Sequence, residues 1–236
     1  MKKMRHLFQY VLSLLTLFFI ISCSKSSDES GGGGSTVTSV TDIDGNVYNA
    51  ITISSQTWMT ENLKTTHYRN GDAITELTSS DFDDWDKIVT GGWTCYNDDA
   101  ATNIPIYGRL YNWRAVNDSR GLAPTGWHIP TDNEWKTLIT FLGNTAVAGG
   151  KMKSTSTLWI SPNTDATNSS GFSAIPGGYR HYNGAFTGIG EQAYWWSSTE
   201  RNADYSYYYT IFNNYAVANQ NNNKKNDLMS IRCVKD

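Results

Sequence analysis

Residues Gly126–Leu138 read GWHIPTDNEWKTL and contain the clearest helix start in the chain. Thr131 and Glu134 have the S/T-x-x-E spacing of a capping box. In that motif the threonine hydroxyl accepts a hydrogen bond from the Glu134 amide, and the glutamate side chain accepts one from the Thr131 amide. Apolar residues then recur at the spacing of one helical face, at Trp135, Leu138, Ile139 and Leu142. We therefore predict an amphipathic helix over about residues 132–142.

The same stretch places three side chains close together that can bind a metal or transfer a proton: His128, Asp132 and Glu134. Capping accounts for Glu134, and the helix dipole favours an acidic residue such as Asp132 in the first turn. A single remaining histidine is more typical of a hydrogen-bonded structural group than of a metal ligand. We therefore predict no catalytic residue, no metal site and no cofactor, and we interpret this stretch as a fold signature.

The rest of the chain predicts one further helix and many short strands. A helix is expected over about residues 109–117, where apolar side chains repeat at Leu110, Trp113 and Val116. Asp44-Gly45 is a hairpin signal between two β-branched runs. Beyond residue 143, strand-like segments alternate with glycines, among them GGKMKS, YWWSSTE and YSYYYTIF. The predicted fold class is α+β, with two helices packed on a short-stranded, mostly antiparallel looped sheet.

The N-terminal residues predict a lipoprotein. A positive start precedes an apolar run from Leu7 to Ile21, which is shorter than the roughly 20 residues that span a bilayer as a helix. Ile-Ile-Ser-Cys at residues 20–23 resembles a lipobox, so we expect residues 1–22 to be a signal peptide and Cys23 to be lipidated. The alternative is an uncleaved anchor followed by an incidental cysteine.

Three regions follow from this assignment. Residues 23–35 would be the lipidated cysteine and a flexible Gly/Ser linker, and residues 36–236 would form one domain. The lipid would attach the protein to the outer membrane, at the cell surface or facing the periplasm. Outside the cytoplasm we expect Cys95 and Cys233 to form a disulfide, with two buried free thiols as the alternative.

The charge of the processed chain excludes one class of partner. Removal of residues 1–22 takes away three of the 19 basic residues and none of the 22 acidic ones, which leaves a net charge of −6. An acidic domain without a Lys/Arg cluster is a poor candidate for nucleic acid, so we expect no nucleic-acid partner.

Residues 202–226 are locally rich in two residue types, with eight asparagines and five tyrosines. Tyrosine provides rigid contact area and asparagine provides adaptable hydrogen bonds, as in antibody loops. The alternative is a pair of strands with Asn-rich turns. Residues 179–182 lie near glycine turns and are expected to be exposed. The ligand-binding residues we expect are Tyr179, Arg180, His181, Tyr182, Tyr205, Tyr207, Tyr209, Asn213, Asn214, Tyr215 and Asn221.

Several segments, taken in their order, carry a family resemblance. They include DIDGNVYNAITISSQTWMTENLKT, YGRLYNWRAV, GLAPTGWHIPTDNEWKTLITFLG, AGGKMKS, SGFSAIPGGYR, WWSSTE and SIRCVKD. From about residue 40 to the end, the chain resembles the Fibrobacter succinogenes major paralogous domain (FISUMP). The resemblance implies a domain of secreted proteins and lipoproteins of Bacteroidetes and Fibrobacter without an established activity. More remotely it implies the C-type lectin-like fold of the formylglycine-generating, sulfatase-modifying enzymes, whose N- and C-terminal strands pair.

The chemistry of those enzymes does not follow from the resemblance. They are copper-dependent oxidases that use a cysteine pair shortly before the final strand, and residues 195–232 contain no cysteine. The Glu-Pro-Asn loop of calcium-dependent lectins is also missing from the sequence. We therefore expect a non-catalytic binding module for a protein or glycan ligand. Two alternatives stay open: a polysaccharide-degradation enzyme or accessory protein, and a structural envelope protein with no dedicated ligand.

Overall fold

The structure is a computed structural model that describes residues 38–236, apart from the side chains of Trp85 and Asp86. These residues belong to one compact unit, Ser35–Asp236. The expected signal peptide 1–22, the lipidated Cys23 and the linker 23–35 lie outside the described residues. Within the part that is described, no helix has both the length and the apolar character needed to cross a bilayer.

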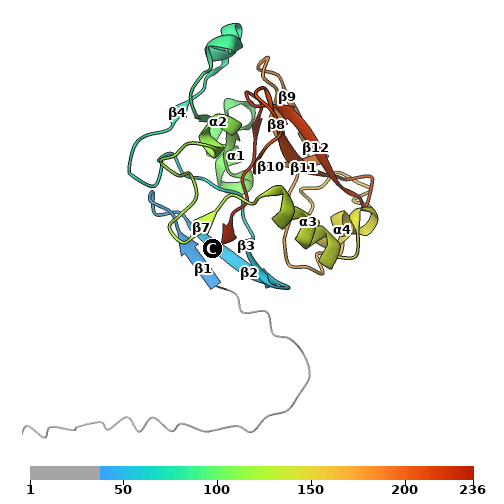
Figure 1. Ribbon diagram of the computed structural model, residues 1–236. Helices are drawn as coiled ribbons and strands as arrows, with labels where there is room; N and C mark the ends of the chain where they lie inside the picture. The colour runs from blue at the N-terminus through green and yellow to red at the C-terminus, as the bar shows by residue number, and fades with distance from the viewer. Residues whose placement is uncertain (1–37) are drawn as a thin grey trace, which may run out of the picture. The chain divides into compact units, whose positions relative to one another are not determined.

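An antiparallel sheet joins the first described strands to the last one (Figure 1). The predicted hairpin at Asp44-Gly45 is confirmed, and Gly45 has a φ of +83°, which L residues rarely adopt. Val234 pairs with both Trp58 and His128, so the last strand lies inside the sheet. In spatial order the strands are β1 (Thr38–Thr41), β2 (Val47–Ile53), β3 (Gln56–Met59), β14 (Val234–Lys235) and β7 (Trp127–His128).

The second sheet is mixed, because β10 pairs in parallel with β8 and β4 pairs in parallel with β5. Its regular part is the antiparallel trio β10, β11 and β12, which includes the predicted segments YWWSSTE and YSYYYTIF. The strands run in the order β12 (Ala218–Lys224), β11 (Tyr205–Phe212), β10 (Gln192–Glu200), β8 (Gly177–Arg180), β13 (Leu228–Met229), β6 (Leu110–Asn112), β5 (Gly92–Thr94) and β4 (Thr75–Glu76), while β9 (Phe186–Ile189) pairs with β8.

The predicted α+β class is confirmed by the helices that accompany these sheets. The described residues form α1 (Ala100–Tyr107), α2 (Trp113–Val116), α3 (Asp132–Phe141) and α4 (Thr145–Met152), and two 3-10 segments, η1 (Ser79–Lys87) and η2 (Tyr96–Asp98).

The two predicted helices have different outcomes. The helix at 132–142 is confirmed as α3, and both hydrogen bonds of the capping box between Thr131 and Glu134 are present. The helix at 109–117 is wrong in its first half, because residues 110–112 form strand β6. Asn112 then caps the short helix α2 by accepting a hydrogen bond from the Ala115 amide.

Helix α4 replaces the strand expected at GGKMKS. Asn144 caps this helix, since its side chain accepts from the Ala146 amide. Gly149 is required by close packing: a Cβ at this position would lie 2.5 Å from the carbonyl oxygen of Val217. Gly149 therefore allows α4 to pack directly on the backbone before β12, and Gly150 allows the close approach of Asp165 in the loop after α4.

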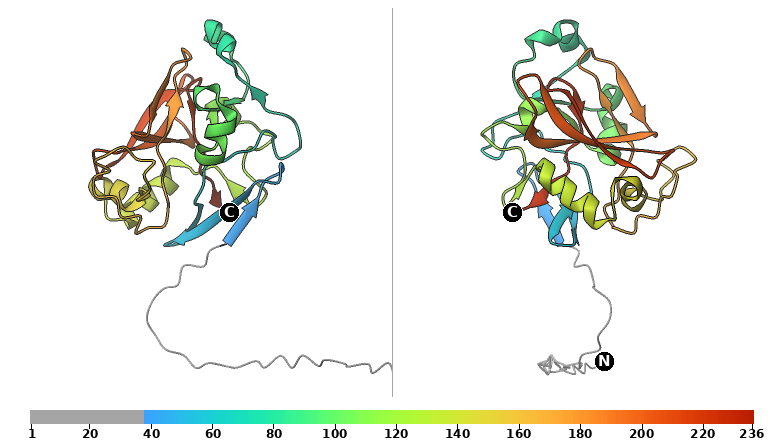
Figure 2. Two further views of the ribbon diagram at one scale, coloured as in Figure 1. Left: turned by 180° about the vertical axis from the view of Figure 1, so that it is seen from behind. Right: turned by 45° about the vertical axis from the view of Figure 1, so that its right-hand side comes forward.

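Aromatic residues fill both faces of the β10–β12 sheet. Helices α3 and α4 cover one face (Figures 1 and 2). On that face the Trp135 ring stacks on Tyr209 with centroids 5.0 Å apart, and it also contacts Trp58 and Trp195. The opposite face contributes Trp196 and other aromatics to a second buried cluster. Most tryptophans are therefore core residues.

A buried arginine links the two sheets. Arg232 is fully buried, and burial lowers its pKa to about 9. Its Nε and one terminal nitrogen donate to Oδ1 of Asn62 at 3.2 and 3.1 Å. The same Asn62 oxygen accepts from Nε1 of Trp195 at 2.9 Å. One amide oxygen thus serves three buried donors.

A buried lysine fixes the turn between β11 and β12. The ammonium of Lys153 donates to the carbonyl oxygens of Thr164 at 2.6 Å and Tyr215 at 2.9 Å, and it also contacts those of Phe212 and Asn213. These carbonyls belong to the long loop after α4 and to the turn. One side chain therefore holds both segments against the helix.

The expected disulfide is wrong, because Cys95 and Cys233 are free buried thiols. Cys95 follows β5 in the mixed sheet, whereas Cys233 precedes β14 in the antiparallel sheet. A disulfide requires Cα atoms within roughly 7 Å, and each thiol packs within its own part of the core instead.

Candidate functional site

The Asn/Tyr-rich segment forms a regular hairpin of β11 and β12. Tyr205 lies opposite Lys224 and Tyr209 lies opposite Gln220. The two ends of this hairpin are different environments. One end meets the β10–β11 turn and α2, and the other end is the turn that Lys153 holds.

Tyr205 and Tyr207 are half-buried on β11, but Tyr209 is not a surface residue. The Tyr209 side chain is 3% exposed, and its hydroxyl donates to Oδ1 of Asp132 at 2.7 Å. Tyr209 is therefore a core residue, whose ring packs on Trp135, and it does not present its side chain to solvent.

The expected residues at the other end of the hairpin are Asn213, Asn214 and Tyr215. Asn213 supports the fold, since its side chain donates to the carbonyl of Ile160 at 3.1 Å. Asn214 and Tyr215 are exposed. Asn221 is exposed on β12, between the two ends. The eleven expected residues therefore do not form one continuous site.

Arg180 is also buried, contrary to the expected exposure of residues 179–182. Its guanidinium lies between the rings of Phe82 and Phe186, at 3.9 and 4.3 Å from their centroids. It pairs with Oδ1 of Asp98 at 2.9 Å. Arg180 thus attaches η1 and η2 to β8, and the half-buried Tyr179 packs beside it on Tyr194 with centroids 4.6 Å apart.

His181 and Tyr182 reach the end of β12. Their rings lie 4.1 Å apart, and the ammonium of Lys224 lies 3.9 Å from the centroid of the Tyr182 ring. The Tyr182 amide donates to Oδ1 of Asp227 at 2.6 Å. Burial raises the pKa of Asp227 to about 6. Tyr182 is therefore brought next to Lys224, which lies opposite Tyr205 in the hairpin; sequence position alone does not indicate this.

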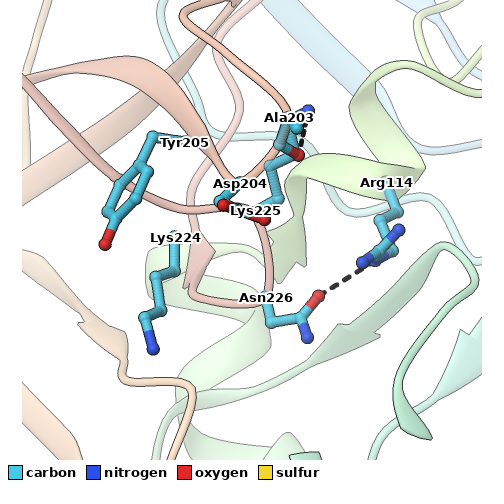
Figure 3. A pocket seen from close by; sticks show the side chains of 7 residues that line it. All are labelled: Arg114, Ala203, Asp204, Tyr205, Lys224, Lys225 and Asn226. Atoms are coloured by element: carbon cyan, nitrogen blue, oxygen red, sulfur yellow. Dashed lines mark hydrogen bonds between the residues drawn. The ribbon is translucent and has the colours of Figure 1, made fainter. Parts of the chain in front are cut away.

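A cavity of about 380 Å³ opens at this end of the hairpin (Figure 3). Three chain segments build it: the β10–β11 turn, the residues that end β12, and helix α2. Tyr205 and Lys224 lie on one side and Arg114 lies on the other. The lining residues are Arg114, Ala203, Asp204, Tyr205, Lys224, Lys225 and Asn226, and we call this the Arg114 cavity.

The β10–β11 turn, which forms one wall of the cavity, is fixed by the side chain of Asn202. Oδ1 of Asn202 accepts hydrogen bonds from the amides of Asp204 at 3.0 Å and Tyr205 at 2.9 Å. This Asx-type turn is the usual role of asparagine between two strands. It sets the positions at which Asp204 and Tyr205 enter the cavity wall.

Arg114 is held by one hydrogen bond and has several unused donors. Its Nε donates to Oδ1 of Asn226 at 2.9 Å (Figure 3). A guanidinium has five N–H donors. Among residues 38–236, the two terminal nitrogens of Arg114 have no hydrogen-bond partner. The half-buried guanidinium is thus oriented by Asn226 with most of its N–H groups available.

Lys225 lies under the cavity as a buried cation. It is 9% exposed, and its ammonium lies 4.7 Å from the centroid of the Trp113 ring. The ammonium donates to the carbonyl of Ala203 at 2.8 Å and pairs with Glu200. Because Glu200 is largely exposed, solvent screens that ion pair.

A second cavity, also of about 380 Å³, adjoins the first because Arg114 and Lys225 line both. Its other charged residues are Asp118, Arg120 and Glu200. Arg120 is already paired with Asp118 at 2.8 Å and with Asp72 at 3.2 Å. Arg114 is therefore the available guanidinium at the boundary between the two cavities.

Sequence reasoning missed Arg114, Lys224, Lys225 and Asn226. The signal was present in NNNKKND, whose adjacent lysines precede the final strands in an otherwise acidic chain. Arg114 could not be linked to them, because only the pairing of β13 with β6 brings the two segments together. The Tyr205 prediction remains compatible with a binding role, since this residue lines the cavity.

The histidine of the opening stretch has structural partners. Nε2 of His128 lies next to Glu134, and its Nδ1 lies next to Asp236. Within residues 38–236, no group of three or more His, Cys, Asp or Glu side chains is arranged to hold a metal ion. The arrangement around Arg114 is suited to non-covalent recognition of a polar ligand.

Comparison with known proteins identifies the family but no individual relative. No curated protein matches the chain, and no solved structure matches it. The model of the Fibrobacter succinogenes major domain matches residues 51–235, which include the mixed sheet, the antiparallel sheet from the middle of β2 onward, and the Arg114 cavity. The chain therefore belongs to the Fibrobacter succinogenes major domain family.

Proposed function

We propose that the protein is a non-catalytic binding module of a cell-envelope lipoprotein, which holds a glycan or protein ligand at the Arg114 cavity. The observation that carries the proposal is the set of side chains that meet there. A guanidinium with unused donors, a tyrosine ring and an amide come from three chain segments. Convergent polar groups beside an aromatic ring are typical of ligand sites.

The fold that we propose is a divergent C-type lectin-like domain. Two features support this: α3 carries the capping-box motif, and β14 pairs with the N-terminal hairpin strand β3. In this proposal the binding surface is formed by the segments that precede the last strands. These segments are β11, β12 and the turns that join them.

The membrane partner that we propose is the outer membrane, reached through lipid on Cys23. The lipobox-like residues 20–23 support this assignment. The test is metabolic labelling of the full chain with a palmitate analogue, with and without globomycin. Loss of label in Cys23→Ala is expected, whereas unchanged label in that variant would contradict the lipid anchor.

Ligand binding is tested with the compact unit Ser35–Asp236 on a glycan array and in a pull-down from envelope extract. Tyr205→Ala is expected to weaken capture at least about tenfold, because its ring forms a wall of the cavity. Tyr215→Ala is the matched control: Tyr215 is exposed at the opposite end of the hairpin. Its removal should leave capture unchanged.

The results also separate the proposal from its alternatives. Capture that is lost with Tyr215→Ala but kept with Tyr205→Ala would move the site to the other end of the hairpin. No capture on either assay would favour a structural envelope protein. Release of reducing sugar from a bound polysaccharide would identify an enzyme.

A further inference from the structure

We infer that the ligand of the Arg114 cavity is an acidic glycan, whose oxyanion sits on the guanidinium of Arg114. This inference rests on the proposed function and names the class of its ligand. The oxyanion is a uronate carboxylate or a sulfate ester, since both match the planar donor fork of arginine.

The first step concerns the donors of Arg114. Asn226 accepts from Nε at 2.9 Å, and this bond fixes the plane of the guanidinium. The two terminal nitrogens have no hydrogen-bond partner among the described residues, although the side chain is half-buried. A partly buried guanidinium whose N–H groups are unused binds an oxyanion more strongly than one in open water.

The second step concerns the local charge. The Arg114 cavity is lined by three basic side chains and one acidic side chain, whereas the whole chain has 19 basic and 22 acidic residues. One of the three, Lys225, is a cation that is 9% exposed beneath the cavity. Its two described acceptors are Glu200 and the carbonyl of Ala203, which leaves one ammonium N–H. The cavity is therefore a positive site on an acidic protein.

The third step identifies the carrier of the oxyanion as a sugar. Tyr205 offers a ring that can stack on a pyranose face, and the carboxylate of Asp204 offers acceptors for hydroxyl groups. A nucleic acid is disfavoured because its continuous phosphate charge would meet Asp204, on a chain that has more acidic than basic residues. A saccharide with separated charges places one oxyanion on Arg114 and neutral hydroxyls beside Asp204.

The experiment is calorimetric titration of Ser35–Asp236 with three oligosaccharides of equal length. They are an oligogalacturonate, its carboxyl-reduced neutral form, and a sulfated galactan. We expect one of the two acidic probes to bind at least about tenfold more tightly than the neutral one, and which of them binds identifies the oxyanion. Binding should weaken as salt concentration rises.

Three variants make the test specific to Arg114. Arg114→Gln should weaken acidic-glycan binding by at least about tenfold, and Arg114→Lys by less, since it keeps the charge but loses the donor fork. Arg201→Gln is the control with the same charge change, because Arg201 is exposed and lines neither cavity. It should change the affinity less than about twofold.

The contrary results are distinguishable. Equal binding of neutral and acidic probes, lost with Tyr205→Ala but kept with Arg114→Gln, would overturn this inference and leave the proposed function in place. Capture of a protein ligand without binding of any acidic glycan would do the same. An absence of every glycan and protein ligand would overturn both.

Discussion

Nε2 of His128 lies 2.7 Å from Oε1 of Glu134, so the histidine of the signature stretch holds the residue that caps α3. Nδ1 of the same ring lies 2.6 Å from Oδ1 of Asp236, just after β14. Carboxylates only accept hydrogen bonds, so the ring satisfies both neighbours when it is protonated at both nitrogens. The imidazolium therefore connects the start of α3 to the residue after β14.

Stability should depend on pH through this contact. Partial burial would lower the pKa of His128, but the hydrogen bonds to Asp236 and Glu134 outweigh burial and raise it above 6.5. Burial would raise the pKa of Glu134, but hydrogen bonds from Thr131 and His128 lower it below 4.5. The histidine contribution is complete below about pH 6.5 and is lost as pH rises through the raised pKa. The glutamate contribution is complete above about pH 4.5 and is lost on acidification.

We expect a maximum in this contribution between about pH 4.5 and 6.5, worth on the order of 1 kcal/mol because the three side chains are partly exposed. Urea denaturation of Ser35–Asp236 at pH 5.5 and 8.5 measures it. His128→Gln should remove the part of the difference that comes from His128, while the part from Asp227, whose pKa burial raises to about 6, should remain. Asn133→Gln, at an exposed and non-titrating position of α3, is the control and should preserve the whole difference.

Asn62→Ala should be among the most destabilising substitutions in the chain. Its amide oxygen serves Trp195 and two nitrogens of Arg232, and all of these groups are buried. Unsatisfied buried donors cost about 1–3 kcal/mol each, so we expect a loss of about 3–5 kcal/mol in the free energy of unfolding. Asn133→Ala, at an exposed position of α3, is the matched control and should change it by less than about 0.5 kcal/mol. A similar small loss for Asn62→Ala would contradict the role of this amide.

Lys153→Met should loosen the turn between β11 and β12 without unfolding α4. The substitution removes the ammonium that donates hydrogen bonds to the carbonyl oxygens of Thr164 and Tyr215. We expect a loss of about 2–3 kcal/mol, with faster amide exchange in residues 163–165 and 212–216. Lys151→Met, also in α4 and half-buried, should leave exchange there unchanged. Equal exchange in both variants would show that the ammonium does not hold the turn.

The two cysteines should behave as inert thiols. Burial raises the pKa of both Cys95 and Cys233 above the ordinary thiol value. In native protein we expect neither to react with an aromatic disulfide reagent at pH 8, and both to react after unfolding in guanidinium. Because they form no disulfide, dithiothreitol should not lower the melting temperature. A melting temperature that falls when dithiothreitol is added would show that a disulfide is present and would contradict two free thiols.

Local sequence signals predicted the parts of the fold that depend on neighbours along the chain. The capping box at Thr131 and Glu134, the Asp44-Gly45 hairpin and the strand Tyr205–Phe212 all follow from residues a few positions apart. The helix expected at 109–117 failed because Leu110 and its neighbours pair with the distant β13 and β5. Tertiary pairing outweighed the local spacing of apolar residues.

The candidate site was predictable only in part for the same reason. Tyrosines on β11 were found by composition, but strand alternation places Tyr205 and Tyr209 on the same face. The distant Trp135 buries Tyr209, while Tyr205 lines a cavity, and spacing along the strand predicts neither. Arg180 is charged and flanked by glycine turns, yet the rings of Phe82 and Phe186 enclose it. Which polar residues are buried depends on partners from distant segments, and those partners cannot be assigned from spacing.

The position of β14 inside the antiparallel sheet determines when the domain can fold. Strands β3 and β7 are both complete early in the chain, but each lacks a neighbour until Val234 is available. A nascent chain therefore carries unpaired strand edges until translation reaches residue 235, and closure of the sheet joins segments far apart in sequence. A chain that ends before Val234 would leave the edge of β3 open to pairing with a strand of another molecule.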